Sequence, residues 1–200
     1  AFYLGTMASA HRRIKKSKEA VGEARECRSL AASVNNTYWV RHCLREEALA
    51  QQDLGNLKAA AEAYRLAVEM GLKGEWRAES LQDLKALAET HEKLGGWDHA
   101  AAAYEKLLGL HQSDFEKAQT LDLMAAVETR RGKPRTAAAF SKQAVELRAL
   151  AKRRTLEHGG GNGEVDEYFG IAAQKERSGD AAGALEAWQT MLTEARKLGN

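Results

Sequence analysis

The sequence predicts an all-α protein built as a stack of helical hairpins, and three observations support this prediction. The 200-residue chain contains a single proline, Pro134, and proline interrupts helices because it lacks a backbone donor and clashes with the preceding turn. Alanine, leucine, glutamate, lysine and arginine, which favour helices, dominate the composition. A pattern of small residues around a glycine also recurs along the chain.

The repeat is clearest in two segments that begin 40 residues apart, LGNLKAAAEAYRLAVEMG from Leu54 and LGGWDHAAAAYEKLLGL from Leu94. Each holds a glycine that we expect to take the left-handed conformation that ends the first helix of a hairpin. Extending the register over the chain gives five units, with Lys15 in place of glycine in the first unit. The glycines of the other units are Gly55, Gly95, Gly132 and Gly179.

Two alanine positions accompany this anchor in all five units, although neither was used to choose it. The alanines seven residues before the anchor are Ala8, Ala48, Ala88, Ala125 and Ala172. The alanines five residues after it are Ala20, Ala60, Ala100, Ala137 and Ala184. We expect both sets where helices cross most closely, and we expect the aromatic residues nine after the anchor, Tyr64, Tyr104 and Trp188, in the core.

The spacing predicts ten helices in five pairs, and Asn35–Thr37 is interpreted as the entry to the third helix. Residues 1–158 would hold four hairpins, a glycine-rich connection would occupy 159–163, and a fifth hairpin would follow in 164–200. We expect one continuous solenoid that is a fragment of a longer chain. The expected pairs are 2–14 with 17–33, 38–54 with 57–72, 76–94 with 97–110, 114–131 with 134–155, and 164–178 with 181–198.

This pattern resembles the tetratricopeptide repeat (TPR), which has small residues at positions eight and twenty, glycine at fifteen and an aromatic at twenty-four. Ala48, Gly55, Ala60 and Tyr64 match these positions in the second unit. No unit has the proline that usually closes the second helix, and the period is nearer 40 than the usual 34 residues. Such lengthened units resemble those of rapsyn, Pins-type scaffolds, kinesin light chains and ciliary TPR proteins. The resemblance implies a right-handed superhelical solenoid of about five hairpins.

The residues that could carry chemistry do not form a recognisable catalytic, cofactor or metal site. The glycine run at 159–163 lacks the strand and the Lys-Ser/Thr of a phosphate-binding loop. His91-Glu92 lacks the second histidine of a zinc-protease motif, and Cys27 with His42-Cys43 lacks metal-ligand spacing. We therefore expect no catalytic residue, no cofactor and no metal, and we interpret both cysteines as reduced, buried core thiols.

The charge pattern gives no indication of nucleic acid or membrane as a partner. Formal net charge is +2, and no run of about 18 apolar residues is present. The basic clusters at 130–135 and 152–154 fall at turns or helix ends, where solvated cations are common. The denser cluster His11–Lys18 could contact an acidic partner.

The resemblance also implies a binding groove, because the first helix of each TPR unit lines the concave face of the solenoid. Positions two, five, nine and twelve of that helix usually point inward. In the second and third units these are His42, Arg45, Leu49, Gln52, Gln82, Lys85, Glu89 and Glu92, and the fourth unit adds Gln119 and Asp122. Glu89 and Asp122 depart from the basic clamp that some TPR proteins use for an acidic chaperone tail. The mixed charges favour a mixed-charge peptide or helix.

The most economical interpretation is a non-catalytic, cytoplasmic scaffold or adaptor that binds one or more proteins in its groove. A regulatory or targeting region of a larger enzyme is the alternative, and an enzyme motif outside these residues would favour it. A role in cytoskeleton or cilium assembly follows only from the named relatives. Binding through the convex face or the edge of the array is also compatible with the sequence.

Overall fold

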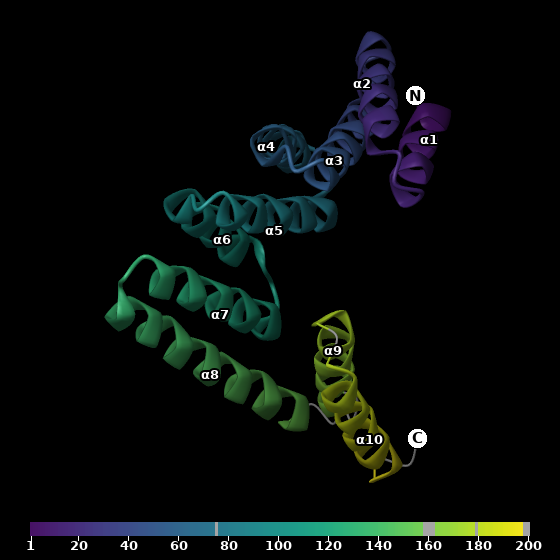
Figure 1. Ribbon diagram of the computed structural model, residues 1–200. Coiled ribbons are helices and arrows are strands. Elements are labelled where there is room, and N and C mark those ends of the chain that lie inside the picture. Colours follow the sequence, from purple (N-terminus) through teal and green to yellow (C-terminus); the bar gives the residue numbers. More distant parts are fainter. Residues whose placement is uncertain (75, 158–162, 179, 198–200) are drawn as a thin grey trace.

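The computed structural model describes residues 1–74, 76–157, 163–178 and 180–197, which form ten helices (Figure 1). Each differs from its predicted range by at most two residues at either end. The first helices of the hairpins are α1 (Phe2–Arg13), α3 (Thr37–Asp53), α5 (Arg77–Lys93), α7 (Asp114–Arg130) and α9 (Gly163–Ser178). The second helices are α2 (Ser17–Ser33), α4 (Leu57–Lys73), α6 (Trp97–Leu110), α8 (Pro134–Glu157) and α10 (Ala181–Lys197).

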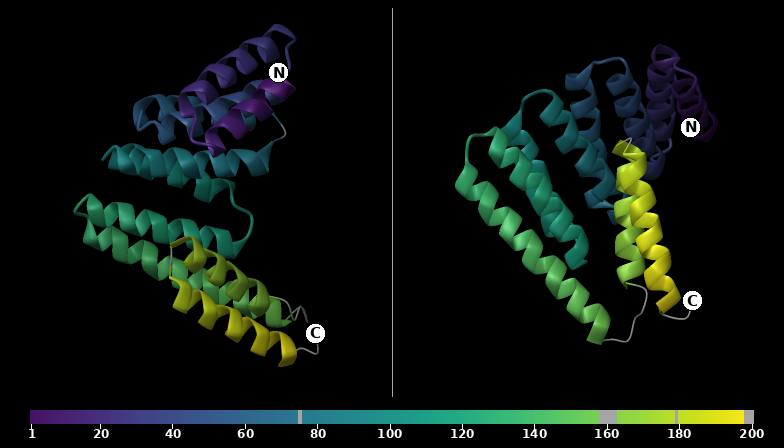
Figure 2. Two further views of the ribbon diagram at one scale, coloured as in Figure 1. Left: turned by 45° about the vertical axis from the view of Figure 1, so that its right-hand side comes forward. Right: turned by 60° about the horizontal axis from the view of Figure 1, so that its bottom comes forward.

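Consecutive hairpins stack on one another in chain order, and the array curves (Figures 1 and 2). Helix α3 packs against both α2 and α4, and α5 against both α4 and α6. Each hairpin therefore covers an apolar face that its neighbour would otherwise expose, which is the physical reason for the repetition. Residues 158–162, which include most of the predicted glycine-rich connection, lie outside the described residues.

Glycine ends the first helix in the way that the register predicts. Gly55, Gly95 and Gly132 have φ angles of 76°, 70° and 73°, a left-handed backbone conformation that is strained for residues with a Cβ atom and therefore favours glycine. Lys15, which takes the place of glycine in the first unit, has a φ of 64°. The predicted turn is thus confirmed in four units, and Gly179 lies outside the described residues.

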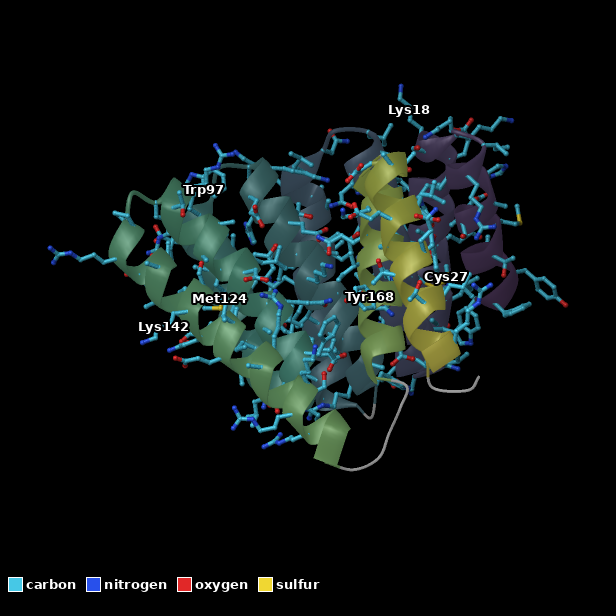
Figure 3. All side chains as sticks on the ribbon, turned by 90° about the horizontal axis from the view of Figure 1, so that it is seen from below. Lys18, Cys27, Trp97, Met124, Lys142 and Tyr168 are labelled. Carbon is cyan, nitrogen blue, oxygen red and sulfur yellow. A yellow bond between two sulfur atoms is a disulfide. The ribbon has the colours of Figure 1, made fainter. Side chains whose placement is uncertain are left out.

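The alanine ladders form the centre of the core. All ten ladder alanines are buried, with Ala48, Ala60, Ala88 and Ala100 fully so. Tyr64 and Tyr104 are also buried, as predicted. Figure 3 shows Met124 among the helices, whereas Lys18 and Lys142 extend outward from the array. Small residues at the crossings let the helix backbones approach, and larger side chains fill the spaces beside them.

Replacing Ala100 by leucine should lower the free energy of unfolding by about 1–3 kcal/mol, because the added atoms must displace packed neighbours. Ala60→Leu should have an effect of similar size, since both alanines are 0% exposed. Ala102 is exposed on the same helix as Ala100, so Ala102→Leu serves as the control. Urea denaturation followed by circular dichroism measures the three changes. Equal stability of Ala100→Leu and the control would contradict the close crossing.

The cysteines depart from the prediction of reduced thiols. Cys27 on α2 and Cys43 on α3 are fully buried, as expected, but they form a disulfide, with 5.9 Å between their Cα atoms. The pairing arises because α3 packs back against α2, which brings two residues 16 apart in sequence face to face. The prediction of free thiols was wrong because helical periodicity places both residues in the core without showing that they meet.

Buried charges join the third helix to its neighbours on both sides. Glu47 of α3 lies 2.7 Å from Arg25 and 3.0 Å from Arg28 of α2. On the other side, Arg41 of α3 donates a 2.6 Å hydrogen bond to Asp83 of α5. Such contacts fix the register between hairpins, because a buried charge needs its partner close by.

Candidate functional site

One cavity is lined mainly by the first helices of the third, fourth and fifth hairpins. It measures about 750 Å³, and we call it the α5–α7–α9 pocket. Four residues that the sequence placed in the groove line it together: Lys85, Glu89, Gln119 and Asp122. The other lining residues are Phe115, Leu123, Arg148, Gly170, Ile171 and Gln174.

Two residues of opposite charge line this pocket without an ion-pair partner among the described residues. Lys85 and Glu89 lie one turn apart on α5 and are exposed, and neither has an ion-pair or hydrogen-bond partner among the described residues. Asp122, by contrast, has a partner, because Arg148 of α8 donates a hydrogen bond to it. The charge that a ligand would meet is therefore that of Lys85 and Glu89, with Asp122 already neutralised.

The pocket also has an apolar wall. Phe115, Leu123 and Ile171 line it and are partly exposed. A Cβ atom built on Gly170 of α9 would lie 3.7 Å from the Phe115 ring, so the backbone of α9 comes near the start of α7 at this point. Apolar surface next to free charges is typical of sites that bind a side chain and fix its orientation.

Two further predicted groove residues have structural partners. Tyr64 donates a 3.1 Å hydrogen bond to Gln52, and Tyr104 donates a 2.6 Å bond to Glu92, in each case to the residue twelve positions earlier. Burial, with the neighbouring carboxylates, raises the pKa of both tyrosines, so each hydroxyl remains a donor. Trp188 makes the corresponding bond to Glu176 in the fifth hairpin. Position twelve of the repeat thus anchors the aromatic residue of its own hairpin.

The remaining predicted residues lie apart from the pocket. Arg45 is 3.5 Å from Asp83, and Leu49 packs against the main core. His42 is half-buried with its ring 5.0 Å from that of Trp39, and Gln82 is exposed. The structure therefore brings together four of the ten predicted residues. Sequence reasoning missed Phe115 and Arg148, although Phe115 is the only aromatic residue of its helix.

Stability should fall as the pH is lowered from 7 to 5, because three histidines prefer their neutral form in the folded protein. Burial lowers the pKa of His42, His91 and His111 below the ordinary value of 6.5. Below that pH the unfolded chain takes up protons first, so stability is lost as the pH falls toward the folded pKa values.

The thermal unfolding midpoint, followed by circular dichroism at several pH values, measures this effect. His42→Gln should reduce the loss between pH 7 and 5, because it removes one of the three groups. An unchanged or higher midpoint at pH 5 would contradict the prediction.

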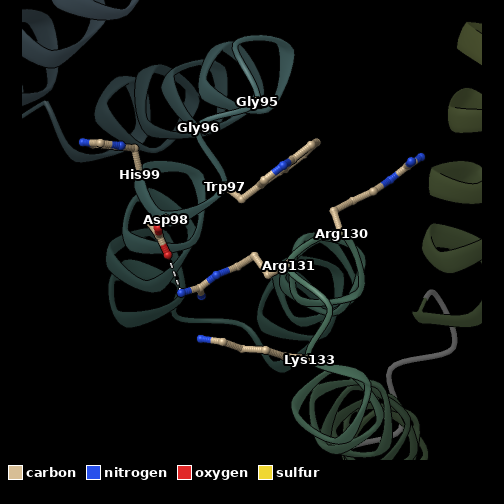
Figure 4. A pocket seen from close by; sticks show the side chains of 8 residues that line it. All are labelled: Gly95, Gly96, Trp97, Asp98, His99, Arg130, Arg131 and Lys133. Atoms are coloured by element: carbon tan, nitrogen blue, oxygen red, sulfur yellow. Dashed lines mark hydrogen bonds and ion pairs between the residues drawn. The ribbon is translucent and has the colours of Figure 1, made fainter.

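A second, smaller pocket lies at the turns of the third and fourth hairpins (Figure 4). It measures about 480 Å³ and includes part of the basic cluster at 130–135. Arg131 donates hydrogen bonds to Asp98 and Glu128. Arg130 extends away from Asp98, whereas Lys133 extends in the same direction as Arg131 (Figure 4). Arg131 thus links the end of α7 to the start of α6, which fits the interpretation that this basic cluster belongs to a turn.

Among the described residues, no group of three or more His, Cys, Asp or Glu side chains is placed to hold a metal ion. None of the helices in the described ranges is long and apolar enough to cross a membrane.

Comparison with known proteins identifies the fold. No family model matches the sequence, and no curated protein matches it either. Solved structures do match, among them BtubC from P. vanneervenii, which is 17% identical with a TM-score of 0.62. That match covers 74% of this chain and 63% of BtubC, so this chain spans less than two thirds of that protein.

Two other structures match along nearly the whole chain. A putative kinesin light chain from Podosopora anserina with TPR-like repeats is 15% identical, with a TM-score of 0.59 over 98% of this chain and 94% of its own. The Rap conjugation gene regulator of plasmid pLS20, solved with the Phr* peptide, is 14% identical, with a TM-score of 0.50 over 98% of this chain and 62% of its own.

These matches define the class of protein: an all-α, right-handed solenoid of TPR-like hairpins, as the sequence predicted. Identities of this size establish the fold alone. Of the relatives suggested by the lengthened repeat, a kinesin light chain is among the structural neighbours, while the similarity to rapsyn, Pins-type scaffolds and ciliary proteins stays a prediction.

Proposed function

We propose that this protein is a non-catalytic scaffold or adaptor that binds a segment of a partner protein in the α5–α7–α9 pocket. The observation that carries the proposal is the combination of an apolar wall with free, opposite charges in a cavity of about 750 Å³. Such a cavity can bury apolar side chains of a ligand and also select their charged neighbours. The proposal includes the cytoplasm as the place where this protein binds its partner.

The peptide complex of the Rap regulator supports the same reading, because that protein has a similar fold and was solved with the Phr* peptide. The stacked first helices of a solenoid form an extended concave surface, which can hold a chain segment over several repeats. A membrane or nucleic-acid role has no comparable feature in its favour.

Site-specific photo-crosslinking tests the proposal. A photo-reactive amino acid at Gln119, which is exposed in the pocket, should capture a small set of proteins from cell extract at one segment of each. The same amino acid at Lys106 is the control, because Lys106 is exposed on α6, the second helix of the third hairpin. Capture of the same segments from both positions would place binding outside the pocket.

Charge reversal then measures the contribution of the pocket to affinity. Lys85→Glu should weaken a captured partner more than tenfold, or about 1.4 kcal/mol, while circular dichroism stays unchanged because Lys85 has no partner among the described residues. Arg45 is unsuitable for this test since it lies beside Asp83, and reversing its charge would disturb the interface between hairpins.

A further inference from the structure

We propose that the α5–α7–α9 pocket selects an extended peptide in which an acidic and a basic residue are separated by one position, next to an apolar residue. This inference rests on the proposed function and adds the recognition pattern of the ligand. It follows from the spacing of the two free charges in the pocket and from the apolar wall beside them.

The first step concerns spacing. Lys85 and Glu89 are four residues apart on α5, which corresponds to a rise of about 6 Å along the helix axis. In an extended peptide, side chains on the same side are two residues apart and separated by about 6.6–6.8 Å. A carboxylate and a cation at positions i and i+2 of such a peptide can therefore face Lys85 and Glu89 at the same time.

The second step concerns charge balance in the pocket. Asp122 and Arg148 already neutralise each other across α7 and α8. Lys85 and Glu89 have neither each other nor another described residue as a partner, although both line the cavity. A ligand with only one sign of charge would satisfy one of them and be repelled by the other, whereas a pair of opposite charges satisfies both.

The third step concerns direction. Phe115 and Ile171 give the wall contributed by α7 and α9 an apolar surface, and Lys85 and Glu89 occupy the α5 side. An apolar side chain held against that wall fixes how the peptide lies, so the order of acid and base relative to it is also fixed. The pocket thereby distinguishes a sequence from its reverse.

The fourth step favours an extended ligand over a helical one. The ligand is a short segment, and isolated helices shorter than about 12 residues are marginal in water.

Selection from a random peptide library displayed on phage tests the inference on the full chain. The protein should enrich peptides that carry an acidic and a basic residue two positions apart beside an apolar residue. Lys85→Met should lose the preference for the acidic residue and Glu89→Gln the preference for the basic one. The matched controls Lys106→Met and Glu105→Gln, at exposed positions of α6, should keep both preferences.

A selected peptide then allows a double-mutant cycle by fluorescence polarisation. Lys85→Met should weaken binding at least fivefold, and replacing the acidic residue of the peptide by alanine should have no further effect in that variant. Circular dichroism of each variant shows that the fold is retained.

The possible outcomes separate the two proposals. Enriched peptides without the charge pair, or with the charges four positions apart as on a helix, would overturn the inference and leave the pocket as a binding site. Enrichment that Lys85→Met and Glu89→Gln leave unchanged would also overturn it. Failure to enrich any peptide would overturn both this inference and the proposed function.

Discussion

Replacing Asp83 by alanine is expected to lower the free energy of unfolding by about 3–5 kcal/mol, because the change leaves a buried guanidinium without its counter-charge. Arg41 and Asp83 are 2% and 0% exposed, and 2.6 Å separates their interacting atoms. Burial raises the pKa of Asp83, although Arg41 and Arg45 favour its charged form. Removal of this carboxylate should therefore lower the free energy of unfolding much more than removal of one partner from an exposed ion pair would.

Urea denaturation measures the effect, and Glu89→Ala on the same helix is the control. Glu89 is exposed and has no partner among the described residues, so its replacement should change stability by no more than about 0.5 kcal/mol. Replacing Arg41 and Asp83 together by apolar residues should recover most of the loss, because no unpaired charge then remains. A cost below about 1 kcal/mol for Asp83→Ala would contradict the buried pair.

The consequence extends beyond one contact because the pair joins α3 to α5 across two hairpins. In a solenoid each repeat contacts only its neighbours, so stability depends on the interfaces between them. Arg45 also lies at this junction, within 3.5 Å of Asp83. Arg45, which the sequence analysis assigned to partner binding, thus contributes to the contact between two hairpins.

Most of the fold could be predicted from the sequence because its information is local and repeated. Helix ends depend on one residue, such as Gly95 with its positive φ or Asn36, which accepts a hydrogen bond from the backbone of Trp39. Small residues at a fixed distance from that end identify the crossings. Five copies of the pattern supported one another, so Lys15 could be assigned to a glycine position that its φ of 64° confirms.

The polar partners could not be predicted in the same way, because periodicity shows which face a residue occupies but not what lies opposite. Gln52 and Glu92 do lie on the first helices as expected, yet each accepts a hydrogen bond from a tyrosine. Asp122 pairs with Arg148, which belongs to another helix of the same hairpin. Only the structure shows that Gln52, Glu92 and Asp122 have partners within the protein, whereas Lys85 and Glu89 have none among the described residues.

Loss of the Cys27–Cys43 bond is expected to lower the free energy of unfolding by about 3 kcal/mol. The two cysteines are 16 residues apart, and a cross-link of this length removes about that much chain entropy from the unfolded state. Because the bond joins α2 to α3, it stabilises the contact between the first two hairpins. The double replacement Cys27→Ala and Cys43→Ala should therefore unfold at lower urea concentration than the oxidised protein.

Reduction provides the internal control for this prediction. A thiol reductant should lower the stability of the unchanged protein but leave the double variant unaffected, and the mass of the intact oxidised chain should be lower by two hydrogens. Both cysteines are 0% exposed, so reduction should become faster when urea opens the interface. Two thiols that titrate freely in protein purified under oxidising conditions would contradict the bond. Disulfides persist mainly in oxidising compartments, so the same thiol titration on protein taken directly from cells also tests the expected cytoplasmic location.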